Sequence, residues 1–330
     1  METEANKRIK WVDIARGYGI ILVILGHLSL QKANIWIYSF HVPLFFFISG
    51  FLFHDSLAIK PFIIKKLKTL MIPYFSLGII AFLLSRLIGS LDISAYDYAK
   101  LFIIQRRFTS MWFLPCIFLL EIFWYFLNKY ESRKQIVVAL VIMLTLIGLL
   151  YSVEIAKPLP WNIDVCFTAM PFFAVGYWLR KSELLNRLAK NKWADALLVF
   201  SLFINIVLSI VNYKLTGNYF DIYHLNYGIV PLTFLAAFAG ILFIVLLSNR
   251  LTILSVSYIG ANSMLYFALQ QIVMIPIAER ILNAMGLINT WGSLIEIGFY
   301  SLFVLLIVLI ITTVLNIIIL HSKLKFIIGK

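Results

Sequence analysis

Three ionisable residues, Asp13, Arg16 and His27, lie within the first long apolar stretch of the chain. In a membrane helix each charged group costs roughly 3 kcal/mol on insertion scales, so its retention indicates a function. A helix turns about 100° per residue, so the 11 steps from Arg16 to His27 complete three full turns plus only about 20°. The same steps raise His27 about 16 Å above Arg16 along the helix axis. The two side chains are therefore expected on one helix face at different depths, with Asp13 close enough to pair with the Arg16 guanidinium.

This geometry suggests a division of labour, with an anion-binding cation near the cytoplasmic end and a titratable group well inside the membrane. Histidine, with an ordinary pKa of about 6.5, is the usual base that takes a proton from a hydroxyl at neutral pH. The guanidinium fork of Arg16 suits the binding of an anion. Two plainer interpretations stand beside this one: Arg16 as a cation that extends to the membrane surface, and His27 as a residue that hydrogen-bonds a neighbouring helix.

A third titratable group opens the next apolar segment, which begins at His41. That segment enters the membrane from the side where the first helix ends, so His41 is expected at a depth similar to that of His27. Pro43 is tolerated in the first helical turn, where its missing N–H would be unpaired in any case. Gly50 is a small residue that lets helices approach closely.

Together these two segments resemble the acyltransferase 3 family of membrane-bound acyltransferases, and most closely its fucose 4-O-acetylase-related branch. The resemblance rests on DIARGYGIILVILGH, which holds Arg16 and His27, and on FHVPLFFFISGFLF, which begins at Phe40. It continues in MWFLP at 111–115, MPFFAVGY at 170–177 and IGANS at 259–263. It therefore covers nearly the whole chain.

The resemblance implies an enzyme that moves an acyl group, usually acetyl, from cytoplasmic acyl-CoA to a hydroxyl of a sugar or another envelope-linked acceptor. The family's arginine and histidine fall on Arg16 and His27 without a gap. Relatives often end the motif of the ninth helix with a histidine, where this chain has Gln270. Glutamine cannot act as a general base, but it can hydrogen-bond, and Asn262, Tyr266 and Gln270 recur at four-residue spacing along one helix face.

The expected mechanism uses His27 as the general base on the acceptor hydroxyl, which attacks the thioester carbonyl. A transient acyl-histidine is the alternative route. Arg16, oriented by Asp13, is expected to bind a phosphate of acetyl-CoA or of another acyl-CoA near the inner surface of the membrane. No metal is expected to take part.

The candidates for an acceptor or supporting site come from several segments, and those before the fourth span lie toward the outer half of the membrane in this topology. They are His41, Arg106, Arg107 and Trp112, together with Asn262, Tyr266 and Gln270. Trp112 could offer a flat face to a sugar ring, although tryptophan also anchors helices at membrane interfaces, and Arg106 and Arg107 also suit hydrated loop cations. Glu121, near the middle of its apolar segment, is expected to pair with a cation or to stay protonated.

The composition indicates which elements must hold these residues. Of the 330 residues, 62% are hydrophobic and only 13% are charged, whereas a soluble domain usually carries about 25% charged residues. So few charges cannot cover a water-facing surface, and a soluble enzyme is therefore excluded.

An all-α, polytopic integral membrane protein with about ten transmembrane helices is predicted instead. A helix of roughly 20 mostly apolar residues crosses a hydrocarbon core about 30 Å thick. Ten segments of this kind are expected, near 11–30, 36–53, 70–90, 112–128, 136–151, 162–180, 193–213, 227–248, 254–278 and 294–319. Because no repeat or Gly/Ser linker divides the chain, a single membrane acyltransferase domain over 1–330 is the simplest arrangement.

The distribution of Lys and Arg predicts the orientation, because these residues are retained on the cytoplasmic side. When the loops are numbered alternately, one side collects 19 Lys and Arg residues and the other 7. Both termini are therefore predicted to be cytoplasmic, in a multi-pass protein of the inner cell membrane. The net charge of +13 then indicates basic loops against an anionic leaflet, with bilayer lipid rather than nucleic acid as the partner.

Two other classes of function compete with the enzyme. A secondary transporter or flippase for a sugar or lipid-linked substrate would also need buried ionisable groups, although the Arg-x10-His segment has no second copy that would indicate an internal repeat. A membrane scaffold would not need charged groups on one helix face. Cys116 and Cys166 lie in apolar runs without the spacing of zinc ligands, so neither a disulfide framework nor a metal site is predicted.

Overall fold

The computed structural model describes residues 9–28, 30, 32–54, 57–131, 133–182, 184–287 and 294–330. Lys7, Arg8 and Ser29, which belong to the predicted basic flank and first span, lie outside these residues. The structure is 81% helical, and its described residues form no strand. The all-α prediction is therefore confirmed.

Eight helical segments within the described residues are long and apolar enough to cross a membrane. Three of them are single helices: α8 (Lys134–Glu154), α11 (Ala194–Thr216) and α12 (Val230–Arg250). Three combine two helices each: Ala33–Phe51 holds α2 (Ala33–Tyr38) and α3 (His41–Phe51), Ile59–Leu87 holds α4 (Ile59–Lys66) and α5 (Ile72–Leu87), and Ser263–Ala284 holds α14 (Ser263–Leu269) and α15 (Ile275–Ala284). The other two are Ser110–Tyr130, which ends in α7 (Phe113–Tyr130), and Ile295–Leu320 within α16 (Leu294–Leu320). Each corresponds to one predicted span, with somewhat different bounds.

The other two predicted spans are also helical but are shorter or more polar. α1 (Lys10–Gly26) has 17 residues, and α9 (Ile163–Ser182) carries Asp164, Arg180 and Lys181. At a rise of 1.5 Å per residue, α1 extends about 25 Å, somewhat less than the hydrocarbon core. The prediction of about ten membrane helices is therefore correct as an approximate number.

The ninth predicted span, 254–278, is not one continuous helix. α13 (Leu254–Ala261) ends at Asn262, whose φ of −124° and ψ of 26° are not helical, and α14 begins at Ser263. A π-helical turn, η5 (Gln270–Met274), then joins α14 to α15, and a second one, η2 (Leu67–Met71), joins α4 to α5. Such wide turns shift the register of the residues that follow them, and they are frequent at functional sites.

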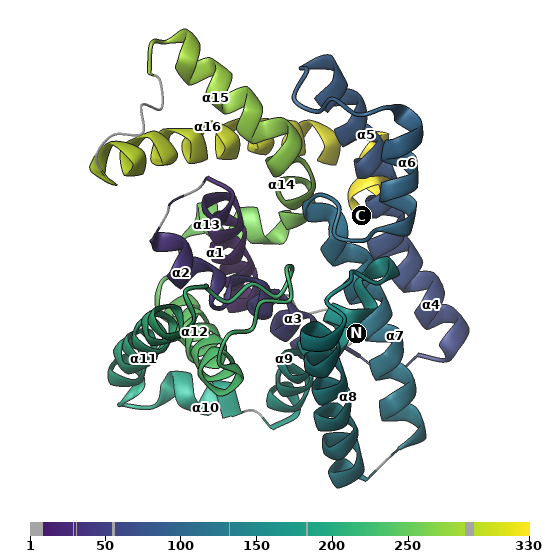
Figure 1. The fold of residues 1–330 in the computed structure, drawn as a ribbon, viewed down its shortest axis with the longest axis vertical. Helices are drawn as coiled ribbons and strands as arrows, with labels where there is room; N and C mark the ends of the chain where they lie inside the picture. The colour runs from purple at the N-terminus through teal and green to yellow at the C-terminus, as the bar shows by residue number, and fades with distance from the viewer. Residues whose placement is uncertain are drawn as a thin grey trace.

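α1 lies in the middle of the fold, with α2, α3, α12 and α13 around it (Figure 1). α1 and α13 approach so closely that their backbones touch. A Cβ added at Gly17 would lie 2.1 Å from the carbonyl oxygen of Val256. One added at Gly260 would lie 1.7 Å from the carbonyl oxygen of Asp13. Only glycine fits at such a crossing, which is typical of helix pairs in membranes.

α3 and α9 make a second reciprocal contact of this kind. A Cβ at Gly50 would lie 2.0 Å from the carbonyl oxygen of Phe173, and one at Gly176 would lie 2.1 Å from that of Phe47. The sequence predicts close approach at Gly50, and the structure supplies its partner. The crossing holds α3, the helix that begins at His41, firmly against α9.

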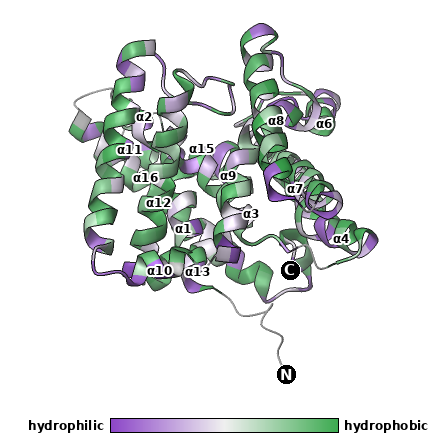
Figure 2. Cartoon of the chain, turned by 90° about the horizontal axis from the view of Figure 1, so that it is seen from below, coloured by the Kyte–Doolittle hydropathy of each residue, from purple (hydrophilic) through white to green (hydrophobic). Residues whose placement is uncertain are grey.

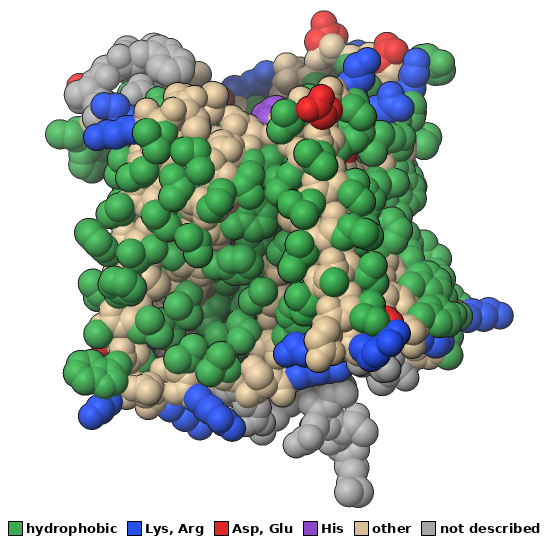
Figure 3. Space-filling model, turned by 60° about the horizontal axis from the view of Figure 1, so that its bottom comes forward, with side chains coloured by type: hydrophobic (Ala, Val, Ile, Leu, Met, Phe, Trp, Pro, Cys, Tyr) green, Lys and Arg blue, Asp and Glu red, His purple; other side chains and the backbone are tan. Residues whose placement is uncertain are grey.

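The outer surface is apolar across the middle of the molecule. Figure 2 shows helices that are hydrophobic along most of their length, with hydrophilic residues near their ends. In Figure 3 the same feature is a band of hydrophobic side chains between two edges where charged side chains gather. α8, α11 and α16 leave large side chains exposed, among them Leu150, Phe203 and Ile310. A protein in water would bury such a band, so this surface faces lipid.

The connecting segments gather at two ends of the helix bundle. At one end the Arg180 guanidinium lies 2.9 Å from His54 Nε2, and Arg250 Nε pairs with Asp195 at 2.8 Å. These contacts join the final turns of α9 and α12 to the loop after α3 and to the start of α11. At the other end the segments 105–112, 157–162 and 217–229 meet.

Candidate active site

A cavity of about 480 Å³ follows α1 through the interior. Arg16 and His27 both line it, with Ile20 and Val23 between them on the same face of α1, as the 11-residue spacing predicts. The remaining walls come from helices α2, α3, α4, α7, α13 and α14 and from the π-helical turns η2 and η5. Residues 109–112, residues 221–224 and the C-terminal segment 328–330 complete the lining. Residues singled out in the sequence that line it are Arg16, His27, His41, Trp112, Glu121 and Asn262.

The end of the cavity at Arg16, Lys66 and Glu121, called the Arg16 end, is strongly charged. Lys66 Nζ donates a hydrogen bond to Glu121 Oε1 at 2.8 Å, and the two side chains are 19% and 6% exposed. Lys330 Nζ donates to Asn262 Oδ1, at the break between α13 and α14. Arg16, Lys66 and Lys330, from three separate segments, thus line the cavity together with the Glu121 carboxylate, and these cations suit the binding of an anion.

The middle of the cavity, called the apolar waist, is lined by Ile20, Val23 and three aromatic rings. Phe113 contacts Phe45 and Phe267 edge-on, with ring centroids 6.0 Å apart in both pairs. The two aliphatic residues lie between Arg16 and His27 along α1, so the waist separates the charged end from the histidines.

The opposite end of the cavity, called the loop end, is defined by His27, His41 and His224. The Nδ1 atom of each ring lies near an oxygen acceptor. His27 Nδ1 lies 2.8 Å from the carbonyl oxygen of Val23, and His41 Nδ1 lies 2.8 Å from that of Ile37. His224 Nδ1 lies 2.6 Å from Asp221 Oδ2. A carbonyl oxygen only accepts, so Nδ1 of His27 and of His41 must carry the proton. In the neutral ring Nε2 then has the free lone pair, as a general base requires.

The loop 217–229 between α11 and α12 forms one wall of the loop end. Asp221 Oδ1 accepts a hydrogen bond from the N–H of Tyr223 at 2.9 Å, while the hydrogen bond to Oδ2 raises the pKa of His224 above its ordinary value. The Tyr223 ring lies against Trp112, with centroids 5.4 Å apart. Burial raises the pKa of Tyr223 to about 12, so its hydroxyl stays protonated and donates to the carbonyl of Arg107 at 2.5 Å.

The segment 105–112, which leads into α7, has a strained backbone. Gln105, Arg107 and Thr109 have positive φ angles of 47°, 57° and 55°. Residues other than glycine rarely adopt such angles, so the surrounding contacts must hold them. The side chain of Asn162 does so: its Oδ1 accepts from the N–H of Arg107 at 3.1 Å, and its Nδ2 donates to the carbonyl of Gln105 at 3.2 Å.

Gln270, at the position where relatives often have histidine, lies outside the cavity lining. It is fully buried, and its amide atoms have no hydrogen-bond partner in the described part of the chain. Its neighbour Gln271 lines the cavity instead, and Gln271 Oε1 accepts from the N–H of Ser110 at 2.6 Å. Tyr266 also lies outside the lining, because its hydroxyl pairs with Thr313 on α16 at 2.6 Å. The break at 262 and the π-helical turn at 270 explain why the four-residue spacing does not bring these side chains to one surface.

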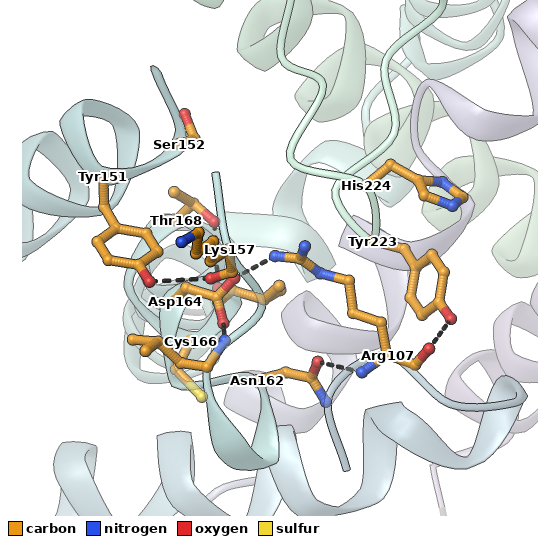
Figure 4. Close-up of polar contacts among 12 residues, drawn as sticks. Arg107, Tyr151, Ser152, Lys157, Asn162, Asp164, Cys166, Thr168, Tyr223 and His224 are labelled. Carbon is orange, nitrogen blue, oxygen red and sulfur yellow. Dashed lines mark hydrogen bonds and ion pairs between the residues drawn. The ribbon is translucent and has the colours of Figure 1, made fainter. Parts of the chain in front are cut away.

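Three other predicted residues lie beside the cavity rather than on its lining. The guanidinium of Arg107 pairs with Asp164, and the two side chains are 8% and 0% exposed. Figure 4 shows Arg107 between its partners, with the side chain toward Asp164 and the backbone between Asn162 and Tyr223. Arg106 is exposed, and Asp13 is buried on α1.

Cys116 and Cys166 are free, buried thiols whose Sγ atoms lie 3.3 Å apart between α7 and α9. They pack where the two helices meet and are not among the residues that line the cavity. Within the described ranges, no group of three His, Cys, Asp or Glu side chains could hold a metal ion.

The 217–229 loop and Lys66 are functional candidates that the sequence did not single out. The loop carried a signal in its composition, because residues 219–227 hold three tyrosines, an aspartate and a histidine between two apolar spans. Lys66 carried no such signal, since it is one of several lysines in a basic connection. Only the fold brings it to Glu121.

The comparison with known families gives one match. A family model described as an acyltransferase domain, that of the acyltransferase 3 family, matches residues 9–314 and thus includes the whole cavity lining except the segment 328–330. No curated protein and no solved structure gives a significant match. Because the family model matches far more than half of the sequence, the chain belongs to the acyltransferase 3 family of membrane acyltransferases.

Proposed function

We propose that this protein is an O-acyltransferase that moves an acyl group, with acetyl as the expected group, from acyl-CoA to a hydroxyl of a sugar or cell-envelope glycan. The observation that carries the proposal is the single cavity that joins Arg16 to His27. It combines an anion-binding end with an unprotonated Nε2 about 16 Å away along α1. Family membership supports acyl transfer, and the resemblance to the fucose 4-O-acetylase-related branch supports a sugar as acceptor.

The donor enters at the Arg16 end. Arg16 binds a phosphate of acyl-CoA through its guanidinium fork, and Lys66 adds positive charge beside it. Asp13, three residues before Arg16 on α1, fixes the direction of the guanidinium. The narrow pantetheine arm then passes the apolar waist and brings the thioester to the histidines.

The transfer itself needs a base, a nucleophile and a leaving group. His27 Nε2 takes the proton of the acceptor hydroxyl as its oxygen attacks the thioester carbonyl. The C–O bond forms, the C–S bond breaks, and the CoA thiolate leaves with the electron pair. The imidazolium of His27 returns the proton to that thiolate, so the products are an ester and CoA thiol. His41 lies beside His27 at the loop end and helps to hold the acceptor.

The distribution of Lys and Arg supports an Arg16 end that opens to the cytoplasm, where acyl-CoA is made. The acceptor then reaches the loop end from the other face of the membrane. This arrangement lets one cavity receive its two substrates from opposite sides.

The first test follows a radiolabelled acetyl group from acetyl-CoA into a glycan fraction, with the purified protein in lipid nanodiscs. We expect covalent transfer, and we expect His27→Ala to lower its rate by about 10² to 10⁴-fold, the usual contribution of a positioned base. Arg16→Ala should instead raise the KM for acetyl-CoA. The matched control is His321→Ala, because His321 is an exposed histidine outside the cavity lining.

Transfer at the normal rate by a folded His27→Ala variant would contradict the assignment of the base. Uptake of a sugar into vesicles without any covalent change would instead favour the transporter alternative. Recovery of a labelled acyl group on His27 itself would replace direct transfer by the acyl-histidine route.

A further inference from the structure

The Asp221–His224 pair at the loop end has no part in the transfer step, yet both residues line the cavity. Asp221 is 6% exposed, and its two carboxylate oxygens accept from the N–H groups of Tyr223 and His224 and from His224 Nδ1. The carboxylate therefore fixes both the turn of the loop and the ring of His224. The His224 side chain itself is 68% exposed, so its Nε2 can reach a bound molecule.

The surface around this pair is aromatic. Tyr223 and Trp112 lie against each other, and both rings line the cavity. Across the loop end, Tyr38 lies 4.9 Å from His41 and 4.9 Å from Tyr219 between ring centroids. Flat apolar rings with a few fixed polar groups among them match a pyranose, which has an apolar face of C–H groups and a rim of hydroxyls.

The charges at this end select against an anionic sugar. The guanidinium of Arg107, which interacts electrostatically with His224, is directed at Asp164 and does not line the cavity. Asp221, by contrast, lies close enough to His27 and His41 to interact electrostatically with both. Once the pH exceeds the raised pKa of His224, that ring is neutral and no longer compensates the Asp221 charge. A carboxylate or phosphate on the acceptor would then meet a buried negative charge beside the base.

We propose that the 217–229 loop forms the acceptor subsite for a neutral pyranose, in which His224, held by Asp221, hydrogen-bonds the hydroxyl next to the one that reacts at His27. Trp112 and Tyr223 contact the apolar face of the same ring. The proposal rests on the proposed function, because it assumes that a sugar hydroxyl is the nucleophile. His224 is thereby a binding residue of the acceptor, and Asp221 is its positioning residue.

The test uses chemical footprinting, which reads binding without any turnover. Diethyl pyrocarbonate acylates a neutral, accessible imidazole, and mass spectrometry measures the rate at each histidine. The protein in nanodiscs is titrated with methyl α-glucopyranoside, methyl α-galactopyranoside and methyl α-fucopyranoside, and with methyl glucuronide and methyl galacturonide as anionic counterparts. His321, exposed and outside the cavity lining, serves as the internal control.

We expect at least one neutral glycoside to protect His224. At about ten times its Kd it should slow the modification about tenfold, because only about a tenth of the sites remain open. The rate at His321 should not change, and the two uronides should protect weakly or not at all. Two results would overturn the neutral subsite. One is that the uronides protect His224 as strongly as the neutral glycosides do, and the other is that a glycoside is acetylated by the protein but does not protect His224.

The pH dependence of the footprint tests the role of Asp221. The charged or titratable groups that line the loop end with His224 are Asp221, Tyr223, Tyr38, His27 and His41. From outside the lining, Arg107 interacts electrostatically with His224, and Tyr219 does so with Asp221. Because the hydrogen bond to Asp221 raises the pKa of His224, the ring stays protonated and unreactive until the pH passes that raised value. In Asp221→Asn the amide still accepts the backbone N–H groups but has no charge, so modification of His224 should begin at lower pH.

Kinetics complete the design and separate the two proposals. His224→Ala should raise the KM for the glycoside that protects His224 about tenfold or more, while kcat and the KM for acetyl-CoA stay nearly unchanged. In His224→Gln the side-chain amide nitrogen replaces Nε2, so this variant should recover much of the lost affinity for the glycoside. A rise in the KM for acetyl-CoA instead would overturn the subsite. Protection of His224 without any transfer from acetyl-CoA would leave the subsite standing and would overturn the proposed function.

Discussion

The ion pair between Lys66 and Glu121 shows how single residues are held at the Arg16 end. The ammonium of Lys66 donates to the carboxylate at 2.8 Å, and both groups are largely withdrawn from solvent. Removal of one member of a buried pair leaves a charge without compensation, whereas replacement of both by apolar residues of similar size is often nearly neutral. The contribution of the pair to stability is therefore visible only when the single and double variants are compared.

Glu121→Gln and Lys66→Met should each lower the free energy of unfolding in detergent by about 3 kcal/mol, and the double variant should recover most of that loss. The Lys66→Met change should also raise the KM for acetyl-CoA, since it removes a cation from the donor end. Thermal unfolding and donor kinetics on the same samples would measure both effects. Strictly additive losses in the double variant would mean that the two side chains do not act as a pair.

At this scale the sequence predicts part of the site. The shared face of Arg16 and His27 follows from helical geometry alone, and both line the cavity. The buried carboxylate of Glu121 could be recognised as needing a cation, but its partner is 55 residues away in sequence and follows only from the fold. His224 could not be assigned from helix periodicity because it lies in a loop.

At the scale of elements, the crossing of α1 and α13 determines where the two site residues of α1 lie. The contact is reciprocal, with Gly17 against Val256 and Gly260 against the carbonyl of Asp13. The obstacle to any larger residue is backbone, so a side-chain rotation cannot relieve it. α1 would have to move as a unit, and Arg16 and His27 would move with it.

Gly260→Ala should therefore lower the free energy of unfolding by about 3 kcal/mol and reduce acyl transfer more than about tenfold, because the new Cβ would lie 1.7 Å from a carbonyl oxygen. Gly298→Ala on α16 is the matched control, since a Cβ there meets nothing within 4 Å. Detergent stability and the rate of transfer are the readouts. Equal behaviour of the two variants would show that the crossing tolerates separation.

The existence and approximate positions of the membrane helices are predictable, because composition alone decides them. Eight of the predicted spans correspond to long apolar helices because the bilayer requires about the same length of each. The break at Asn262 and the π-helical turn at Gln270 were not predictable from periodicity, because they depend on backbone hydrogen bonds and on neighbouring segments. These irregularities place Gln271, rather than Gln270, on the cavity.

At the scale of the whole molecule, the charge distribution and the cavity agree on a direction. Arg16, Lys66 and the segment 328–330 line the same end of the cavity, and the basic loops of the sequence fall on that side in the predicted topology. The 217–229 loop belongs to the opposite end. The orientation in the cell is a prediction from the rule that basic loops stay in the cytoplasm.

Single cysteines would test this orientation, since Cys116 and Cys166 are buried. A membrane-impermeant maleimide should label Asp92→Cys in intact cells, because Asp92 is exposed in the connection between α5 and α6 (Ala95–Ile104). Lys192→Cys and Lys325→Cys should react only after the membrane is opened. The reverse pattern would invert the protein in the membrane, and labelling of all three in intact cells would refute the assignment of sides.

The apolar waist has a consequence in electrical terms. A cavity that receives one substrate from each face of a membrane is a potential leak for protons and ions, and the membrane potential would drive that leak continuously. Ile20, Val23 and the rings of Phe45, Phe113 and Phe267 interrupt the polar lining between Arg16 and the histidines. Water and ions are unstable along such an apolar lining, whereas an uncharged thioester arm is not. Under the proposed function, the acyl group would thus pass through the bilayer interior while the protein remains an insulator.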